Sequence, residues 1–407
     1  MLSLKGIMGR FEFRFQGLPV VLAMVLAIAV PSFAAQVTKP TYQQASDALY
    51  NLDFSIAEHA FNSLIATDGS NPDYWNGLAS TMWLKIFYDQ QKLNIESYSG
   101  GSIGTRNSRD YVNPEEEKKL RATIDTAIDK ANALLKKDPN DVRALYALGV
   151  SNSTMAAFEG IAKRSYYAAL TRAKAAKTYH ERVIKLDPKF NDALVSIGTY
   201  EYGVGVIPAI YRVFLGFFGV SGSKEAGIRD LEKAAAQGDR ARTDAKTILI
   251  VIYYREHQYD QSLRLIDELL TKYPRDFQLE MERASIYGKM KNWSQSVEVY
   301  RHVLSKIQAK QDGYERLRID RVYAQVGFAN ISLLKLDDAI NDYGQVTGST
   351  QADDNEKADA YLWLGRIYDS RDQRDKAVDQ YNAIIKLNCN NSYKEDAKAY
   401  LRRAYRG

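Results

Sequence analysis

Cysteine and histidine, on which many enzymes and metal proteins rely, are scarce in this chain. Among 407 residues there is one cysteine, Cys389, which excludes an intramolecular disulfide and a cysteine-based zinc cluster. The four histidines (His59, His180, His257 and His302) are scattered, with no HExxH or other metal-ligand spacing. A G-x-S-x-G motif and a nucleotide-binding motif are also missing. We therefore predict a non-enzymatic protein without a cofactor or metal, in which His180 is a packed core residue.

Strong charge of either sign is also lacking. The formal net charge is +5, and the first 34 residues contribute +2 of it through Lys5, Arg10 and Arg14 against Glu12. The remaining chain is close to neutral for its length, so it gives no case for binding nucleic acid.

The N-terminal residues 1–34 have the pattern of a secretory signal peptide. Three basic residues precede the apolar run Leu18–Val30, and Ser32-Phe33-Ala34 supplies the small residues that a signal peptidase reads. The run is 13 residues long, whereas about 20 are needed to span a bilayer. We expect cleavage after Ala34 and export to a bacterial periplasm or cell surface, with an uncleaved membrane anchor as the alternative.

The stretch Ala358–Asn391 has the apolar spacing of two short amphipathic helices joined by a turn near Arg371–Arg374. Its small and large residues recur at intervals of three, four and seven: Tyr361, Leu364, Gly365 and Tyr368, then Ala377, Tyr381 and Ile384. A pair this short cannot bury its apolar stripe alone and needs similar neighbours. The stretch resembles the tetratricopeptide repeat (TPR) family, with its period of 34 residues and pattern W-x2-L-G-x2-Y…A-x3-F…P. Tyr361 replaces the usual Trp and Cys389 the usual Pro.

Similar units recur along the chain. Those that begin at residues 243, 277, 320 and 358 are separated by 34, 43 and 38 residues, whereas the junctions at Pro139, Pro188 and Gly238 are 49 and 50 residues apart. The resemblance implies an all-α fold, a right-handed α-solenoid of about eight TPR-like helix hairpins. We expect lengthened helices in an N-terminal array, residues 41–241, and a regular array, residues 242–407, that ends in a capping helix over Glu395–Arg406.

Gly203–Gly222 is the most apolar stretch after the signal peptide. Residues 199–245 around it resemble a segment of the eukaryotic TPR family linked to the mitochondrial outer membrane and inclusion-body clearance. Two interpretations are open: a helical insert that buries its own apolar surface, or an exposed patch for a partner, a membrane surface or lipid. The candidate contacts are Val213, Phe214, Phe217 and Phe218. The glycine-rich stretch Ser97–Arg109 lacks the GK[ST] of a phosphate-binding loop, so we predict a solvated connection.

In TPR proteins the first helices of each pair line a concave surface that binds a protein or peptide. The resemblance places Tyr254, Arg255, Lys289, Phe328 and Arg366 on this surface, and in the last unit also Leu362 and Asp369. The Lys/Asn clamp for a C-terminal carboxylate is absent, because its positions hold Tyr146, Val150, Thr247 and Val251. The leading hypothesis is an exported scaffold for protein–protein interaction. The alternative is a solute- or lipid-binding component with an apolar pocket in the N-terminal half.

Overall fold

The computed structural model describes residues 39–90, 93, 111–208 and 220–406. Within these ranges there are 17 α-helices and no strands, and the chain from Lys39 onward forms one compact unit. The all-α prediction is therefore confirmed. The predicted signal peptide, the stretch 97–109 and the candidate contacts Val213, Phe214, Phe217 and Phe218 lie outside the described residues.

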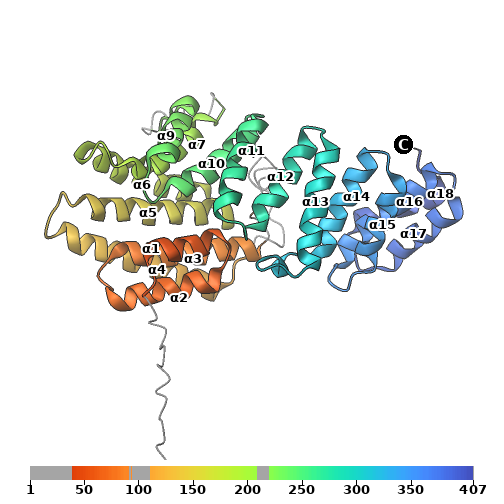
Figure 1. Cartoon of the computed structure of the whole chain (residues 1–407), viewed down its shortest axis with the longest axis horizontal. Helices are drawn as coiled ribbons and strands as arrows, with labels where there is room; N and C mark the ends of the chain where they lie inside the picture. Colours follow the sequence, from red (N-terminus) through yellow and green to blue (C-terminus); the bar gives the residue numbers. More distant parts are fainter. Residues whose placement is uncertain (1–38, 91–92, 94–110, 209–219, 407) are drawn as a thin grey trace, which may run out of the picture. The chain divides into compact units, whose positions relative to one another are not determined.

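The helices follow one another as eight hairpins and a final single helix. Each packs chiefly on the helix before it and the helix after it, which is the arrangement of an α-solenoid, and Figure 1 shows this succession clearly from α12 to α18. The helices are α1 (Tyr42–Tyr50), α2 (Phe54–Thr67), α3 (Pro72–Asp89), α4 (Pro114–Leu135), α5 (Val142–Ala157), α6 (Tyr166–Leu186), α7 (Leu194–Gly205), α9 (Lys224–Gln237), α10 (Arg242–Arg255), α11 (Tyr259–Lys272), α12 (Phe277–Lys289), α13 (Trp293–Gln308), α14 (Ile319–Ser332), α15 (Leu336–Thr347), α16 (Asp354–Ser370), α17 (Arg374–Lys386) and α18 (Asn391–Arg402).

Helix length differs between the two halves. Helices α3, α4 and α6 have 18, 22 and 21 residues and α5 has 16, whereas the helices from α10 to α18 have between 12 and 17. A short π-helical segment, η3 (Phe158–Ala162), extends α5 further. The predicted lengthening is thus present in the second and third hairpins, while α7 and α9, with 12 and 14 residues, have ordinary lengths. No helix in the described part of the chain is both long and apolar enough to cross a membrane.

Within a hairpin, a glycine of the first helix faces a ring of the second. A Cβ added to Gly365 would lie 2.3 Å from the ring of Tyr381, and one added to Gly149 would lie 2.0 Å from the ring of His180. Any side chain at these glycines would push the two helices apart. The glycine of the repeat pattern is therefore required by the ring that it faces, which explains why small and large residues recur together.

Five of the hairpins share one kind of turn. A residue in the left-handed region follows the first helix in each, with φ between 57° and 61° at Leu52, His257, Lys291, Leu334 and Asp372. Its N–H and the next N–H donate to carbonyls of the last helical turn, as in Asp372 to Asp369 and Gln373 to Tyr368. None of the five is a glycine, so each carries the steric cost of a left-handed side chain. The turn predicted near Arg371–Arg374 is confirmed.

Helices α7 and α9 approach each other more closely than side chains would allow. A Cβ on Gly227 would lie 2.4 Å from the backbone nitrogen of Tyr202 and 2.5 Å from the carbonyl oxygen of Gly198. Backbone atoms cannot move aside as the end of a side chain can. We therefore expect Gly227→Ala to lower the free energy of unfolding by about 2 kcal/mol, the range of overpacked cores, as measured by urea denaturation.

Gly344 is the matched control for this substitution, because nothing lies within 4 Å of its added Cβ and it sits inside α15. Gly344→Ala should raise stability by about 0.5–1 kcal/mol through helix propensity alone. Equal effects of the two substitutions would contradict the packing of α7 on α9.

His180 is packed in the core, as predicted. It is 1% exposed, its ring stacks on that of Tyr146 at 5.0 Å, and its Nε2 donates to the Tyr146 carbonyl at 3.0 Å. Burial disfavours the charged form and lowers the pKa of His180 from 6.5 to about 4, against the smaller opposing effect of its backbone hydrogen bonds.

This pKa shift makes folding depend on pH. Between pH 6.5 and 4 the unfolded chain binds a proton at this histidine and the folded chain does not, so stability falls as the pH falls through this window, by an amount on the order of 3 kcal/mol. His180→Phe should flatten the curve of unfolding free energy against pH over this range, whereas the exposed His59→Gln should leave it unchanged. An unchanged slope in His180→Phe would contradict a neutral buried histidine.

Candidate functional site

The structure brings two of the predicted binding residues, Phe328 and Arg366, onto one surface. Phe328 on α14 is 42% exposed, and the Arg366 side chain on α16 is 19% exposed. Trp363 lies between them, with its ring against both side chains. Of the other candidates, Arg255 and Lys289 are exposed. Tyr254 is only 6% exposed and packs in the core of α10 and α11, which leaves little of its side chain for a partner.

These side chains belong to a continuous row across the C-terminal hairpins. We name it the aromatic strip, defined as Trp293, Phe328, Trp363, Arg366, Tyr400 and Tyr405. The ring of Phe328 meets Trp293 at 5.8 Å and Trp363 at 5.9 Å, both nearly edge-to-face. The Arg366 guanidinium then lies 5.0, 5.3 and 5.4 Å from the ring centres of Trp363, Tyr400 and Tyr405. Rings and a cation in this order form one continuous surface in which the cation lies among aromatic rings.

The hairpin glycines explain why Phe328 and Arg366 point outward. Each follows directly after a glycine that faces a ring inside its own hairpin, Gly327 against Tyr343 and Gly365 against Tyr381. One residue further along an α-helix turns the side chain by about 100°. Phe328 and Arg366 therefore occupy equivalent positions on successive first helices.

The prediction that Leu362 and Asp369 line the binding surface is wrong. Leu362 is 3% exposed and belongs to the apolar cluster that includes Ala397 of the capping helix α18. The Asp369 carboxylate is buried beneath the chain that follows α18. A solenoid needs such a terminal helix to cover its last apolar face, and this cover buries residues that would be open in an internal repeat.

Asp369 is the buried acceptor that holds the C-terminal end in place. Its carboxylate accepts hydrogen bonds from Arg374 at 2.9 and 3.1 Å, from the Tyr381 hydroxyl at 2.9 Å and from the Tyr405 amide at 2.8 Å. Arg374 also donates to the carbonyls of Tyr400 and Leu401 at 2.7 and 2.9 Å. The Asp369–Arg374 pair therefore fixes the two tyrosines of the aromatic strip.

Four strip residues were not found from the sequence: Trp293, Trp363, Tyr400 and Tyr405. Trp363 precedes the Leu-Gly pair of the repeat and is not a pattern position, and the tyrosines join the strip only because α18 folds back. The tryptophans are the one feature of the sequence that could have indicated the strip. Two of the four tryptophans of the chain lie in it, and tryptophan is enriched in binding hot spots.

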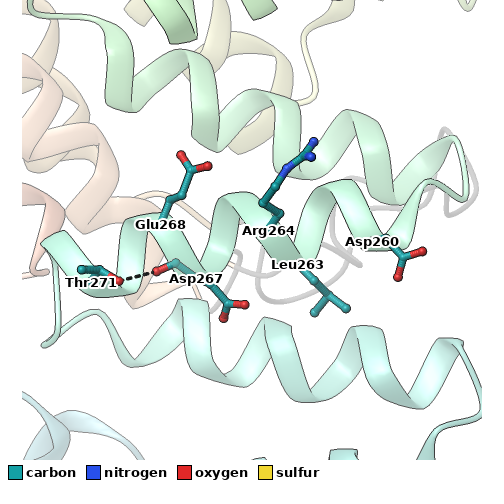
Figure 2. Close-up of a pocket in the computed structure, with 6 residues that line it drawn as sticks. All are labelled: Asp260, Leu263, Arg264, Asp267, Glu268 and Thr271. Carbon is teal, nitrogen blue, oxygen red and sulfur yellow. Dashed lines mark hydrogen bonds between the residues drawn. The ribbon is translucent and has the colours of Figure 1, made fainter.

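Two hollows elsewhere on the described surface are lined mainly by polar residues. The first, about 480 Å³, follows one face of α11 (Figure 2), along Asp260, Leu263, Arg264, Asp267, Glu268 and Thr271. Two of its three acids are paired, Asp267 with Arg283 at 3.1 Å and Glu268 with Lys246 at 2.6 Å. The second is lined by Asp129, Asn132, Leu135 and Lys136 of α4. In the described part of the chain, no group of three or more His, Cys, Asp or Glu side chains is placed to hold a metal ion.

Two segments of the chain match family models described as tetratricopeptide repeat, residues 42–84 and residues 358–391. The first covers α1, α2 and most of α3, and the second covers most of α16 with α17. No curated protein matches the chain in sequence.

Solved structures with a similar fold share little sequence with the chain. A tetratricopeptide repeat protein from Parabacteroides merdae is 13% identical, with 76% of this chain and 92% of that chain covered and a TM-score of 0.31. Yeast Tom70 is 12% identical over 88% and 87%, with a TM-score of 0.34. The human IFIT1 dimer with PPP-AAAA is 16% identical over 89% and 79%, with a TM-score of 0.37. At these scores the likenesses carry no inference about ligands.

The buried Asp369–Arg374 pair can be tested by substitution. Asp369→Ala leaves Arg374, the Tyr381 hydroxyl and the Tyr405 amide without their acceptor, so we expect a loss of about 3 kcal/mol in unfolding free energy. Limited proteolysis should cut first in α18. The control Asp337→Ala removes the partner of Arg371 at an 82% exposed side chain and should change stability by no more than about 0.5 kcal/mol. Equal stabilities of the two variants would contradict this role of Asp369.

Proposed function

We propose that this chain, which is a tetratricopeptide repeat protein, is an exported scaffold that binds another protein through its aromatic strip. Two matches to the repeat family and the succession of helical hairpins support a role in protein interaction. Export rests on the signal-peptide pattern of residues 1–34, with the periplasm or cell surface as the destination.

The exposed ring of Phe328 is the observation that carries this proposal. It is 42% exposed and packs nearly perpendicular to the rings of two tryptophans, Trp293 and Trp363, so these contacts order the ring while it remains accessible to water. Burying such a ring against a partner removes apolar surface from water. It costs little side-chain entropy, because the ring is already ordered. Aromatic and arginine side chains are also the types that contribute most at protein interfaces.

The strip fits a helix or extended segment of a partner protein with an apolar side chain beside an acidic one. The apolar side chain would pack on Phe328 and Trp363, and the carboxylate would face Arg366. The only carboxylate paired with Arg366 among the described residues is Asp396, at 3.6 Å and 52% exposed, so a partner's carboxylate can replace it. The near-neutral charge of the chain gives no reason to include nucleic acid among the partners.

Substitution of Phe328 tests the strip. Residues 35–407 are immobilised, an envelope extract is passed over them, and the retained protein is identified and titrated. Phe328→Glu places a charge among the rings without touching the core, and it should weaken binding about 10- to 100-fold. Phe328→Tyr keeps the ring and should retain binding. Leu334→Glu, at an 83% exposed leucine in the same hairpin, is the control for added surface charge. Circular dichroism and melting must match the unsubstituted chain.

Other outcomes select other surfaces. Binding that survives Phe328→Glu at full strength would overturn the strip as the docking surface. Loss of binding only when Val213, Phe214, Phe217 and Phe218 are changed together to serine would place the contact in the apolar segment 203–222. Lipid or a small molecule that co-purifies, with no protein retained, would support the solute- or lipid-binding alternative.

A further inference from the structure

The turn between the first two helices is bound by the middle of the chain. In this turn, Asn51–Leu52–Asp53, the Asp53 carboxylate is 3% exposed and accepts from two arginines, Arg275 and Arg316. The Arg275 Nε lies 3.1 Å from it. Arg316 also donates to the Leu52 carbonyl, and the Arg275 amide donates to the Asn51 side chain at 3.1 Å. These pairs join residues more than 220 positions apart.

Apolar side chains complete the contact. Leu52 and Phe54 are 7% and 8% exposed. The Phe54 ring lies 5.4 Å from that of Tyr88 on α3, and Tyr88 lies 6.2 Å from Phe277 at the start of α12. The turn is therefore anchored by a buried carboxylate and by apolar burial on both sides of it.

Three sets of ion pairs across this contact have the same polarity, whereas Asp244 of α10 accepts a hydrogen bond from Tyr50 of α1 at 2.7 Å. The acids come from the N-terminal helices and the bases from the middle of the chain: Asp47 with Lys272 at 3.9 Å, Asp73 with Arg240 at 2.7 Å, and Asp53 with its two arginines. Opposite faces of unlike charge attract each other over several ångströms before they touch. Asp47 and Asp53 belong to the first hairpin and its turn, whereas Asp73 belongs to α3, so two of the three sets bind the hairpin itself.

The first hairpin is held by α3 and, through this contact, by the middle of the chain, where Tyr50 of α1 also packs on Tyr273 at 5.1 Å. In the described chain, α1 and α2 have one sequential neighbour, α3, because no helix of the compact unit precedes them. Terminal repeats of a solenoid open at a lower free energy than internal ones. The basic side chains that hold the turn are 27% to 52% exposed, so water and ions reach them from outside.

We propose that the Asn51–Asp53 turn is a reversible clasp: the first hairpin closes on the Arg275–Arg316 pair and opens as a unit, with its helices intact. Opening uncovers Leu52, Phe54 and Phe277 together with the two arginines. This device is independent of the aromatic strip and would stand if the strip bound nothing.

Hydrogen exchange at the Arg275 amide reports the clasp directly, because that amide donates to Asn51 across the contact. In residues 35–407, Asp53→Asn removes the charge that the two arginines bind. We expect exchange at Arg275 and at residues 52–54 to accelerate about 100-fold or more, while α16–α18 and the circular dichroism stay unchanged. Asp337→Asn, at an exposed surface pair, should change exchange at Arg275 by less than about 2-fold.

A second pair of variants tests the apolar anchor at constant turn geometry. Leu52 and Leu334 occupy the same left-handed turn, with φ of 61° and 59°, but Leu52 is buried and Leu334 is 83% exposed. Glycine accommodates this φ without strain. Leu52→Gly should accelerate exchange at Arg275 at least about 10-fold, whereas Leu334→Gly should leave it unchanged. In the unsubstituted chain, 1 M salt should accelerate exchange there and not in α16–α18.

Two results would overturn the clasp. One is unchanged exchange at Arg275 in both Asp53→Asn and Leu52→Gly. The other is a parallel rise in α16–α18, because that would mean that the contact is part of one cooperative core. Should both variants fail to fold, the salt series on the unsubstituted chain decides, since a uniform or absent response contradicts separate opening of the first hairpin.

Discussion

The contact on which the rest of this structure depends is that between a glycine of one helix and a ring of the next. It recurs as Gly149 with His180, Gly327 with Tyr343 and Gly365 with Tyr381. Because the ring fills the space of the missing side chain, the two helices of a hairpin keep one spacing and one rotation about their axes. That rotation decides which side chains of a hairpin are exposed. The outward positions of Phe328 and Arg366 are direct consequences.

The aromatic strip shows how an exposed surface is built from such local rules together with one contact between residues that are distant in the sequence. Phe328 and Trp363 meet because consecutive hairpins stack, which any solenoid provides. Tyr400 and Tyr405 join them because Asp369 and Arg374 hold the capping helix and the chain after it. The same cap buries Leu362 and Asp369, so the terminal hairpin offers a different surface from an internal one.

The first hairpin adds a contact that repeat proteins do not need for folding. Neighbouring hairpins already bury the apolar stripes of α1 and α2 in part, yet Asp53 is carried back to two arginines of the middle of the chain. A buried carboxylate is costly unless both its oxygens are paired, so this contact specifies one position of the hairpin. The lengthened α3–α6 lie between the two partners of the contact along the chain. Their length is therefore one of the factors that decide whether Asp53 reaches its arginines.

The local level of the structure was determined by the sequence alone. Periodicity predicted the helices, the interval from Pro139 to Pro188 predicted the long hairpin of α5 and α6, and the repeat spacing predicted that Leu364 and Gly365 are buried. These features depend on residues a few positions apart, where helical geometry leaves little choice. The tertiary structure alone decided which exposed residues meet: Phe328 with Trp363, Arg366 with Tyr405, and Asp53 with Arg316. Such contacts depend on how each stacked helix is rotated relative to the one before it and on where the chain folds back. A pattern of residues a few positions apart does not determine either.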